Sequence, residues 1–178
     1  METGHTQLRK YEEYAYVLDS KSHTKSTTVH GRTGIIVVAI GEERLTLLEI
    51  LGIENSTFNV GEKIYIGKEG RTKVQSVLGK MDYIKISDSA KNEIPGVVES
   101  IVTENEKKFV DYINNAQPLT PRIHALELIP GIGKTYLNVI IKEREKAPFE
   151  SFNDMEKRAG LKEPSKHLSQ RIIEEISG

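Results

Sequence analysis

The chain has 178 residues, of which 37% are hydrophobic and 29% are charged, and it contains neither cysteine nor tryptophan. This length and composition are typical of a globular protein with one large domain or two small ones. Without cysteine there is no disulfide, thiol nucleophile, thiolate zinc site or iron–sulfur cluster. The 25 basic and 26 acidic side chains nearly cancel, so binding of a polyanion would have to come from local groups.

Residues 1–7 are predicted to be a disordered lead-in, because they are polar and lack the apolar core of a signal peptide. No apolar run in the sequence approaches the length that spans a bilayer, and we expect no membrane partner. The absence of cysteine suits a reducing compartment, so the expected location is cytoplasmic.

Residues 8–87 are dominated by short segments with β-strand patterns. The expected strands, the last two joined around Gly79-Lys80, are Tyr11–Leu18, Gly34–Ile40, Arg44–Leu51, Lys63–Gly67, Lys73–Leu78 and Asp82–Ile86. Gly41-Glu42-Glu43 lies between two apolar runs and is typical of a hairpin turn. These segments favour a small five-stranded Greek-key barrel, which needs five of the six, with the oligonucleotide-binding (OB) barrel as the leading candidate.

Two basic loops of this barrel would flank the ligand face of an OB fold, since that face lies between the loops after the first and fourth strands. The loops are Ser20–Thr33 and Gly67–Thr72, and their basic residues are Lys21, Lys25, Arg32, Lys68 and Arg71. We interpret them as a secondary surface for a nucleic-acid backbone; the alternative is two ordinary solvated loops. The rings of Tyr14, Tyr16 and Tyr65 would either stack on bases or fill the barrel.

Residues 88–120 are predicted to be a helical connector. Asp88 or Ser89 can cap its first helix, and Pro95 is expected to begin a second helix. Apolar residues at helical spacing, such as Val98 and Val102, favour packing against a neighbouring module.

Residues 121–178 carry the strongest motif. Two apolar helices, Ile123–Ile129 and Lys134–Glu145, flank the corner Pro130-Gly131-Ile132-Gly133. This pattern resembles the helix-hairpin-helix family. The first-turn amides of a helix lack intrahelical acceptors and can bind an anion, and glycine lets a ligand approach the main chain. The residues predicted to hold a nucleic-acid backbone are Gly131, Ile132, Gly133, Lys134 and Thr135.

Residues 148–178 are predicted to be a degenerate second copy of this hairpin. Helices over Asn153–Ala159 and Lys166–Ile176 flank Gly160-Leu161-Lys162. The second glycine is missing, so a structural role is favoured, with Gly160, Lys162 and Lys166 as weaker candidates for backbone contact.

The whole chain also resembles an archaeal family of uncharacterised proteins, domain of unknown function six-five-five. The segments that carry the resemblance are ENEKKFVDYINNAQPLTPRIHALELIPGIGK and PFESFNDMEKRAGL. The resemblance implies an α+β protein, an N-terminal OB-like barrel followed by an all-α pair of helix-hairpin-helix motifs, with a nucleic-acid partner. It favours RNA over DNA, because genes of the family lie near translation and transcription genes.

No catalytic, cofactor or metal constellation is evident. The five histidines have no ligand spacing, and Gly133-Lys134-Thr135 is not a nucleotide P-loop, because Leu128 stands where that motif needs glycine. We therefore expect a non-catalytic nucleic-acid-binding protein. The alternative is a protein–protein adaptor that docks ribosomal or polymerase-associated proteins, which the near-zero net charge favours.

Overall fold

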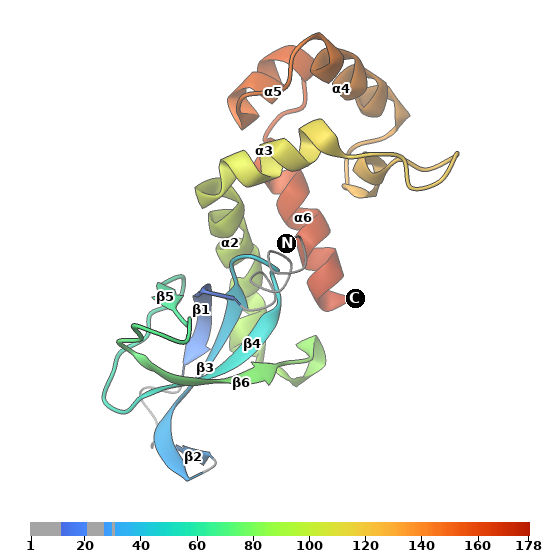
Figure 1. Cartoon of the computed structure of the whole chain (residues 1–178). Helices are drawn as coiled ribbons and strands as arrows, with labels where there is room; N and C mark the ends of the chain where they lie inside the picture. The colour runs from blue at the N-terminus through green and yellow to red at the C-terminus, as the bar shows by residue number, and fades with distance from the viewer. Residues whose placement is uncertain (1–11, 21–26, 30) are drawn as a thin grey trace, which may run out of the picture. The chain divides into compact units, whose positions relative to one another are not determined.

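The computed structural model describes residues 12–20, 27–29 and 31–178. The chain divides into two compact units. One, here called the sheet unit, runs to Val97 and takes in Ile176–Gly178; the other, the helical unit, comprises Val98–Glu175. An antiparallel sheet is followed along the chain by helices (Figure 1), so the predicted α+β class is confirmed.

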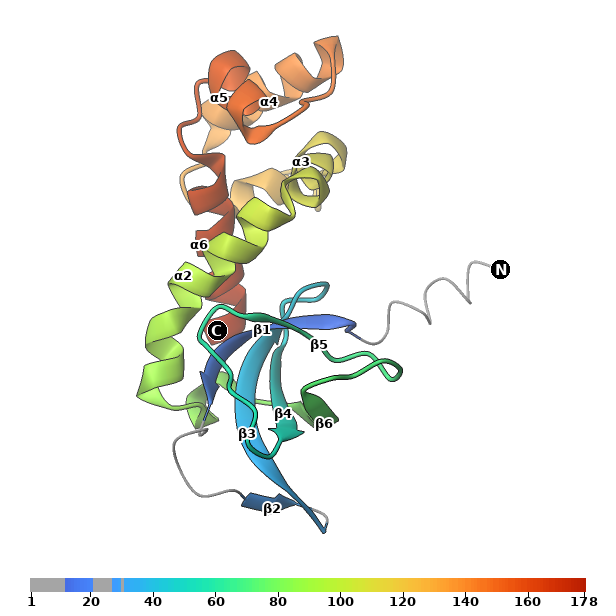
Figure 2. The same cartoon turned by 90° about the vertical axis from the view of Figure 1, so that its left-hand side faces the viewer.

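The sheet consists of antiparallel strands whose order is β5-β1-β3-β4-β6, with β2 paired to β3 off this path. Among the described residues, β5 and β6 do not pair, so the sheet is open between its two edge strands. The strong twist of β3 and β4 is visible in Figure 2. The strands are β1 (Tyr14–Ser20), β2 (Thr27–Val29), β3 (Arg32–Gly41), β4 (Leu47–Ile53), β5 (Lys63–Tyr65) and β6 (Val74–Lys80).

The core of the sheet unit follows from alternation along the strands. In β3 the side chains of Ile35, Val37 and Ala39 are buried in one cluster, because successive residues of a strand point to opposite faces. Members from neighbouring strands include Val17 of β1 and Ile50 of β4. The β-branched runs in the sequence therefore identified most of the sheet.

Two strand predictions need correction. Asp82–Ile86 is not a strand: Tyr83–Lys85 forms the short 3₁₀ helix η1. Ile84 is 80% exposed while Ile86 is buried, so the alternation there does not mark one buried face. The strand expected from Arg44 begins only at Leu47. The preceding residues form the turn, in which the amide of Gly41 donates to the carbonyl of Thr46 at 2.9 Å.

The helices are α2 (Asp88–Glu104), α3 (Glu106–Asn115), η2 (Ala125–Leu128, 3₁₀), α4 (Lys134–Lys146), α5 (Phe152–Ala159) and α6 (Pro164–Ser177). The prediction that Pro95 begins a new helix is wrong, because Pro95 lies inside α2. The break comes at Asn105, whose backbone leaves the helical region and whose side-chain amide donates to the carbonyl of Ile101 at 2.8 Å. No helix in the described part of the chain is long and apolar enough to cross a membrane.

The first helix of the predicted hairpin is also shorter than expected. Instead of Ile123–Ile129, only the four residues of η2 are helical. The cause is a turn just before it: Pro118 and His124 form an antiparallel bridge, and the carbonyl of Ile123 accepts from the amide of Leu119 at 2.8 Å. Ile123 is held by this turn and is not free to join the helix.

Candidate nucleic-acid interface

The corner Pro130–Thr135 connects η2 to α4 through two glycines with different conformations. Gly131 has φ of +89°, a region that side chains rarely adopt. Gly133 has extended backbone and is the N-cap of α4. Between them Ile132 is 4% exposed, so it holds the corner onto the helical unit as the sequence predicts.

The first amides of α4 point to no acceptor within the protein. The first helical bond runs from the amide of Leu137 to the carbonyl of Gly133, at 2.9 Å. In the described residues nothing accepts from the amides of Gly133, Lys134 or Thr135, and all three residues are exposed. The corner therefore presents a set of N–H donors to solvent, at the end of the helix where the macrodipole is positive.

The two glycines differ in what surrounds them. A Cβ atom on Gly131 would lie 2.5 Å from Cε1 and Nδ1 of His167, whereas one on Gly133 would meet nothing within 4 Å. The His167 ring lies against the corner, with Nδ1 at 2.8 Å from the carbonyl oxygen of Pro130. Gly133, rather than Gly131, is thus the position that is open to a ligand.

Lys134 is less mobile than the sequence suggested. Its ammonium contacts the carboxylate of Glu127 and donates to the carbonyl of Arg122 at 3.0 Å. The hydrogen bond from Lys134 holds the pKa of Glu127 below its usual range, and the backbone amide of His124 adds to this effect. Because the Lys134 charge is already paired, the unpaired amides are the principal attraction for an anion at this corner.

His124 is a buried capping residue. It is 6% exposed, and its Nδ1 accepts from the amide of Leu126 at 3.1 Å. The backbone amide of His124 donates to the carboxylate of Glu127. Burial is the main cause that lowers the pKa of His124, and the nearby positive charge of Arg144 adds to it. This lowered pKa and the acceptor role of Nδ1 both favour the neutral ring, which fixes the start of η2.

The second corner has fewer backbone donors open to a ligand than the first. Gly160 ends α5 in the left-handed region with φ of +75°, and Leu161, which is 2% exposed, packs inward as Ile132 does. The amide of Glu163 donates to the carboxylate of Glu156 at 2.5 Å. Pro164, the first residue of α6, has no N–H.

The charges of the second corner are also less suited to an anion. Lys166 is paired with Glu163 at 3.1 Å, and this hydrogen bond is the main cause that raises the pKa of Lys166. Lys162 is exposed. The carboxylates of Glu156 and Glu163 lie at this corner, so it is less suited to an anion than the first corner.

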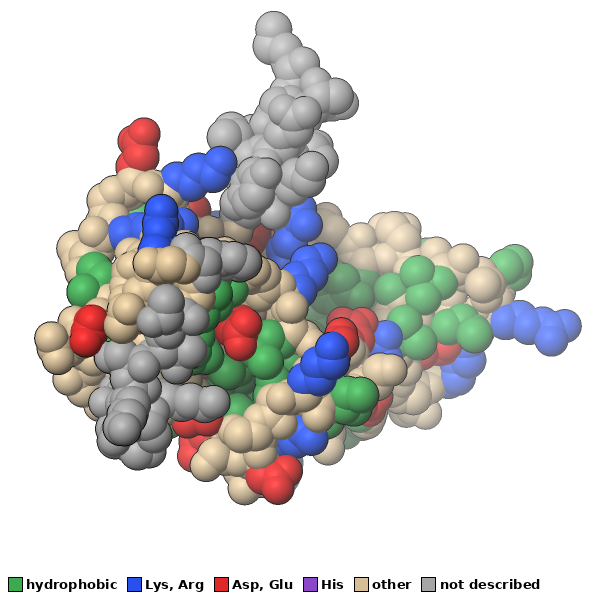
Figure 3. All heavy atoms as spheres, turned by 90° about the horizontal axis from the view of Figure 1, so that it is seen from below, with side chains coloured by type: hydrophobic (Ala, Val, Ile, Leu, Met, Phe, Trp, Pro, Cys, Tyr) green, Lys and Arg blue, Asp and Glu red, His purple; other side chains and the backbone are tan. Residues whose placement is uncertain are grey.

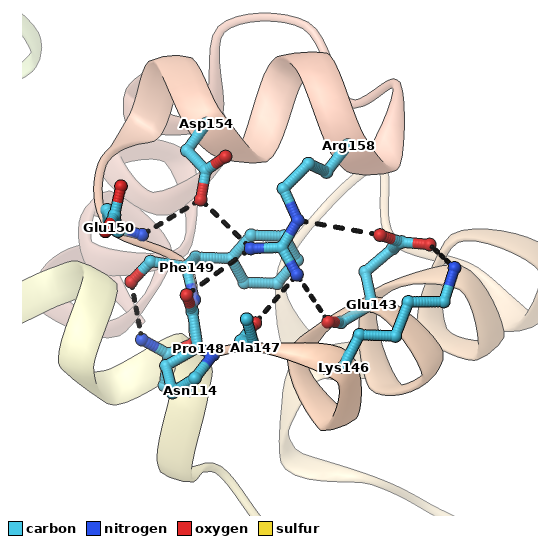
Figure 4. A network of polar contacts seen from close by, with 9 residues as sticks. All are labelled: Asn114, Glu143, Lys146, Ala147, Pro148, Phe149, Glu150, Asp154 and Arg158. Carbon is cyan, nitrogen blue, oxygen red and sulfur yellow. Dashed lines mark hydrogen bonds and ion pairs between the residues drawn. The ribbon is translucent and has the colours of Figure 1, made fainter.

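Arg158 joins α5 to the end of α4 (Figure 4), and the sequence analysis did not single it out. Its guanidinium donates to the carbonyls of Glu143, in the last turn of α4, and of Ala147, the C-cap of α4, at 2.5 and 2.7 Å. It also pairs with Asp154 at 3.0 Å and lies 4.6 Å from the centre of the Phe149 ring. The spacing of Asp154 and Arg158 on one helix was the only sequence signal for this network.

The two basic loops predicted in the sheet unit, Ser20–Thr33 and Gly67–Thr72, are connected by hydrogen bonds at one point. Lys21 and Lys25 lie outside the described residues, whereas Arg32 and Lys68 are exposed. Arg71 is half-buried and donates to three backbone carbonyls, those of Ile66, Gly67 and Gln75. The side chain of Gln75 in turn donates to the carbonyl of Thr33 at 2.6 Å. Arg71 and Gln75 therefore connect the second loop to the end of the first.

The three tyrosines have different surroundings. Tyr16 is 1% exposed and donates its hydroxyl hydrogen to Glu42 at 2.9 Å, so it belongs to the interior and cannot stack on a base. Tyr14 is 38% exposed and packs edge-to-face on Tyr65, with ring centres 5.3 Å apart. The ammonium of Lys63 lies 4.7 Å from the centre of the Tyr14 ring.

Charged side chains form no broad field on the face drawn in Figure 3, where blue and red side chains are interspersed with hydrophobic ones. Within the described residues, no cluster of three or more His, Asp or Glu side chains could hold a metal ion.

Comparison with known proteins identifies the family. Residues 11–178 match the family described as "Protein of unknown function (DUF655)". The chain belongs to this family. The DUF655 chain is 38% identical to the uncharacterised protein MJ0038 of Methanocaldococcus jannaschii over 169 residues, which are 95% of this chain and 76% of that protein. The crystal structure of Af1531 from Archaeoglobus fulgidus, also DUF655, is 39% identical, superposes with a TM-score of 0.81 and covers 94% of both chains. The predicted archaeal family is confirmed.

Proposed function

We propose that this DUF655 protein is a non-catalytic, cytoplasmic nucleic-acid-binding protein that holds the phosphate backbone, with RNA favoured over DNA. The observation that carries the proposal is the set of exposed amides of Gly133, Lys134 and Thr135, which have no acceptor in the described residues. Phosphate oxygens are strong acceptors and bind readily at helix N-termini. Such contacts fix the position of a strand without reading its bases.

A more specific interpretation of the sheet and of the glycine corner supports this proposal. We interpret the strand order β5-β1-β3-β4-β6 as that of an OB barrel opened between β5 and β6, a fold whose faces and loops bind oligonucleotides. We interpret η2, the glycine corner and α4 as a helix-hairpin-helix motif with a shortened first helix. In this interpretation the corner grips one phosphate, and Arg32, Lys68 and Arg71 of the barrel loops provide further cationic contacts.

A second candidate function is a protein adaptor for ribosomal or polymerase-associated partners. Apolar side chains flank the corner in the sequence: Leu119 is 59% exposed, Ile123 44% and Leu128 39%. Exposed apolar groups are typical of protein contacts, and the bond from Lys134 to the Arg122 carbonyl holds part of this segment beside α4. Co-purification after nuclease treatment separates the two functions, because partners that remain bound without nucleic acid support the adaptor.

The decisive experiment uses Gly133, since a side chain there has open space and ordinary backbone angles. In Gly133→Asp the new carboxylate can accept from the amides of the first turn, as N-cap aspartates do. It therefore blocks the donors and adds a negative charge without unfolding the corner. Gly133→Ala is the matched control, because it adds a methyl group and no acceptor.

We expect Gly133→Asp to weaken binding of a fluorescent single-stranded RNA by about tenfold or more, since charged hydrogen bonds at such sites contribute about 1.5–3 kcal/mol. Gly133→Ala should bind nearly as tightly as the natural chain. The log–log salt slope should reflect about −0.7 for each phosphate contact on a single strand. Equal affinity of both variants, or an affinity that does not depend on salt, would refute the proposal; a DNA strand of the same sequence tests the preference for RNA.

A further inference from the structure

A cleft of about 430 Å³ opens in the sheet unit where the two edge strands fail to pair. We call it the seam cleft. Its apolar floor is formed by Leu48, Ile66 and Val77, and its remaining lining residues are Glu12, Arg44, Thr46, Lys68, Arg71, Gly79 and Lys80. Its volume falls within the range of small-molecule sites, which is about 300–1,000 Å³.

Positive charge dominates the rim of the seam cleft, because four basic side chains line it against one carboxylate. That carboxylate, Glu12, is engaged by the β3–β4 turn: its two oxygens accept from the amides of Glu43 and Arg44 at 2.7 and 2.8 Å. In the described part of the chain, Arg71 and Lys80 have no carboxylate partner. The rim is therefore suited to an anion.

The cleft is also preformed. Arg71 is held by the carbonyls of Ile66, Gly67 and Gln75, so the loop after β5 is fixed to the beginning of β6. Leu48 and Ile66 are 7% and 2% exposed, which anchors the floor in the core of the sheet unit. Binding of a ligand would therefore not carry the entropic cost of ordering these groups.

We propose that the seam cleft binds a nucleoside monophosphate unit, with the flat base against Leu48, Ile66 and Val77 and the phosphate at the basic rim. An apolar surface beside concentrated positive charge matches a base joined to a phosphate better than it matches either group alone. The choice of ligand rests on the proposed function. The unit is either a free nucleotide or one nucleotide of a bound strand, and both present the same chemistry.

The test is a titration of the full chain with adenosine 5′-monophosphate, followed by NMR of the methyl groups of Leu48, Ile66 and Val77. We expect saturable shifts of these methyl groups with a Kd of about 1 mM or below. Adenosine alone and inorganic phosphate alone should bind more weakly. Absence of shifts at these methyl groups, or equal shifts with inorganic phosphate alone, would overturn the inference.

Two variants with controls define the site. Lys80→Glu reverses a charge at the rim and should weaken binding of the nucleotide by about tenfold, a loss typical of a contact to a charged group; Lys85→Glu makes the same change at an exposed residue of η1 that does not line the cleft and should leave binding unchanged. Val77→Phe should fill the floor and also weaken binding, provided that its thermal unfolding stays close to that of the natural chain. Equal effects of Lys80→Glu and Lys85→Glu would contradict the site.

Failure of this inference and failure of the proposed function are distinguishable. Gly133→Asp should lose strand binding and retain nucleotide binding. If the natural chain binds the RNA strand but not the nucleotide, nucleotide binding at the seam cleft is refuted and strand binding is supported. If it binds the nucleotide but not the strand, the proposed function is refuted and the seam cleft is supported. Displacement of the nucleotide by the strand identifies the natural ligand as part of a strand, and lack of displacement identifies a free nucleotide.

Discussion

The two corners of the helical unit share an outline and differ in the state of their backbone donors. Both turn on a glycine with positive φ, at Gly131 and Gly160, and both bury one aliphatic side chain, Ile132 or Leu161. The first leaves the amides that begin α4 without acceptors in the described residues, whereas the second supplies a carboxylate and a proline at the same place. The comparison shows that a glycine with positive φ does not by itself make a corner suited to an anion. The backbone amides beside it must also be without acceptors in the protein.

The largest expected effect is a loss of stability when the positive-φ glycine of the first corner is replaced, compared with the same replacement in the second corner. Gly131→Ala should lower the free energy of unfolding by about 2–4 kcal/mol, because it combines a left-handed backbone with displacement of the His167 ring. Gly160→Ala should cost only about 1–2 kcal/mol, since its Cβ would meet open space. Urea denaturation measures both. Equal losses would show that His167 does not constrain the first corner.

The next effect concerns the ion pair beside the first corner. Glu127→Gln should strengthen binding of the RNA strand by about two- to fivefold, because it removes a negative charge and releases Lys134 toward a phosphate. Glutamine keeps an oxygen for the amide of His124. Glu145→Gln, which makes the same change of net charge at an exposed residue of α4, is the control and should have little effect. A weaker affinity of Glu127→Gln would mean that the ion pair itself is required for binding.

A smaller effect is expected in the pH dependence of stability. The pKa of Glu127 in the folded protein is below 4.5, chiefly because Lys134 donates to it. A carboxyl group with a lowered pKa stabilises the fold above its unfolded pKa, and this contribution disappears as the pH falls through the folded pKa. The stability difference between the natural chain and Glu127→Gln should therefore shrink as the pH is lowered below 4.5. Denaturation curves across this range measure it, and a constant difference would contradict the assignment.

The smallest effect is expected at the second corner. Lys162→Ala and Lys166→Ala should each change strand affinity by less than about twofold, as expected for weak exposed charges, because the amide of Glu163 is already bonded and Pro164 has no N–H. Fluorescence anisotropy with the same RNA strand provides the measurement. A loss comparable to that of Gly133→Asp would make the second corner a binding site in its own right.

Most of the sheet was predictable from sequence because it depends on local pattern. The β-branched run in β3 and the glycine turn that follows it specify a hairpin without help from distant residues. Predictions failed where the pattern was short. In Asp82–Ile86 only Ile86 of the two alternating isoleucines is buried, and the segment contains a 3₁₀ turn. The extended backbone of His124 prevents the residues before η2 from being helical.

The glycine corner was predictable as a local motif, but its surroundings were not. His167 lies 37 residues from Pro130 in the sequence, and nothing in the local pattern indicates that its ring covers Gly131. The pairing of Lys134 with Glu127 depends on the tight corner between η2 and α4. Tyr14 and Tyr16 occupy equivalent positions of an alternating strand, yet only the fold decides that one is exposed and the other buried.

Residues of α5 and α6 hold α4 at both ends: His167 contacts the carbonyl of Pro130 before the helix, and Arg158 binds the carbonyls of Glu143 and Ala147 where it ends. A helix anchored in this way has lost its freedom of movement before any ligand arrives, so the entropic cost of ordering has already been met during folding. In the proposed function, α5 and α6 therefore need no ligand contact of their own to contribute to affinity, because they make the neighbouring helix α4 rigid.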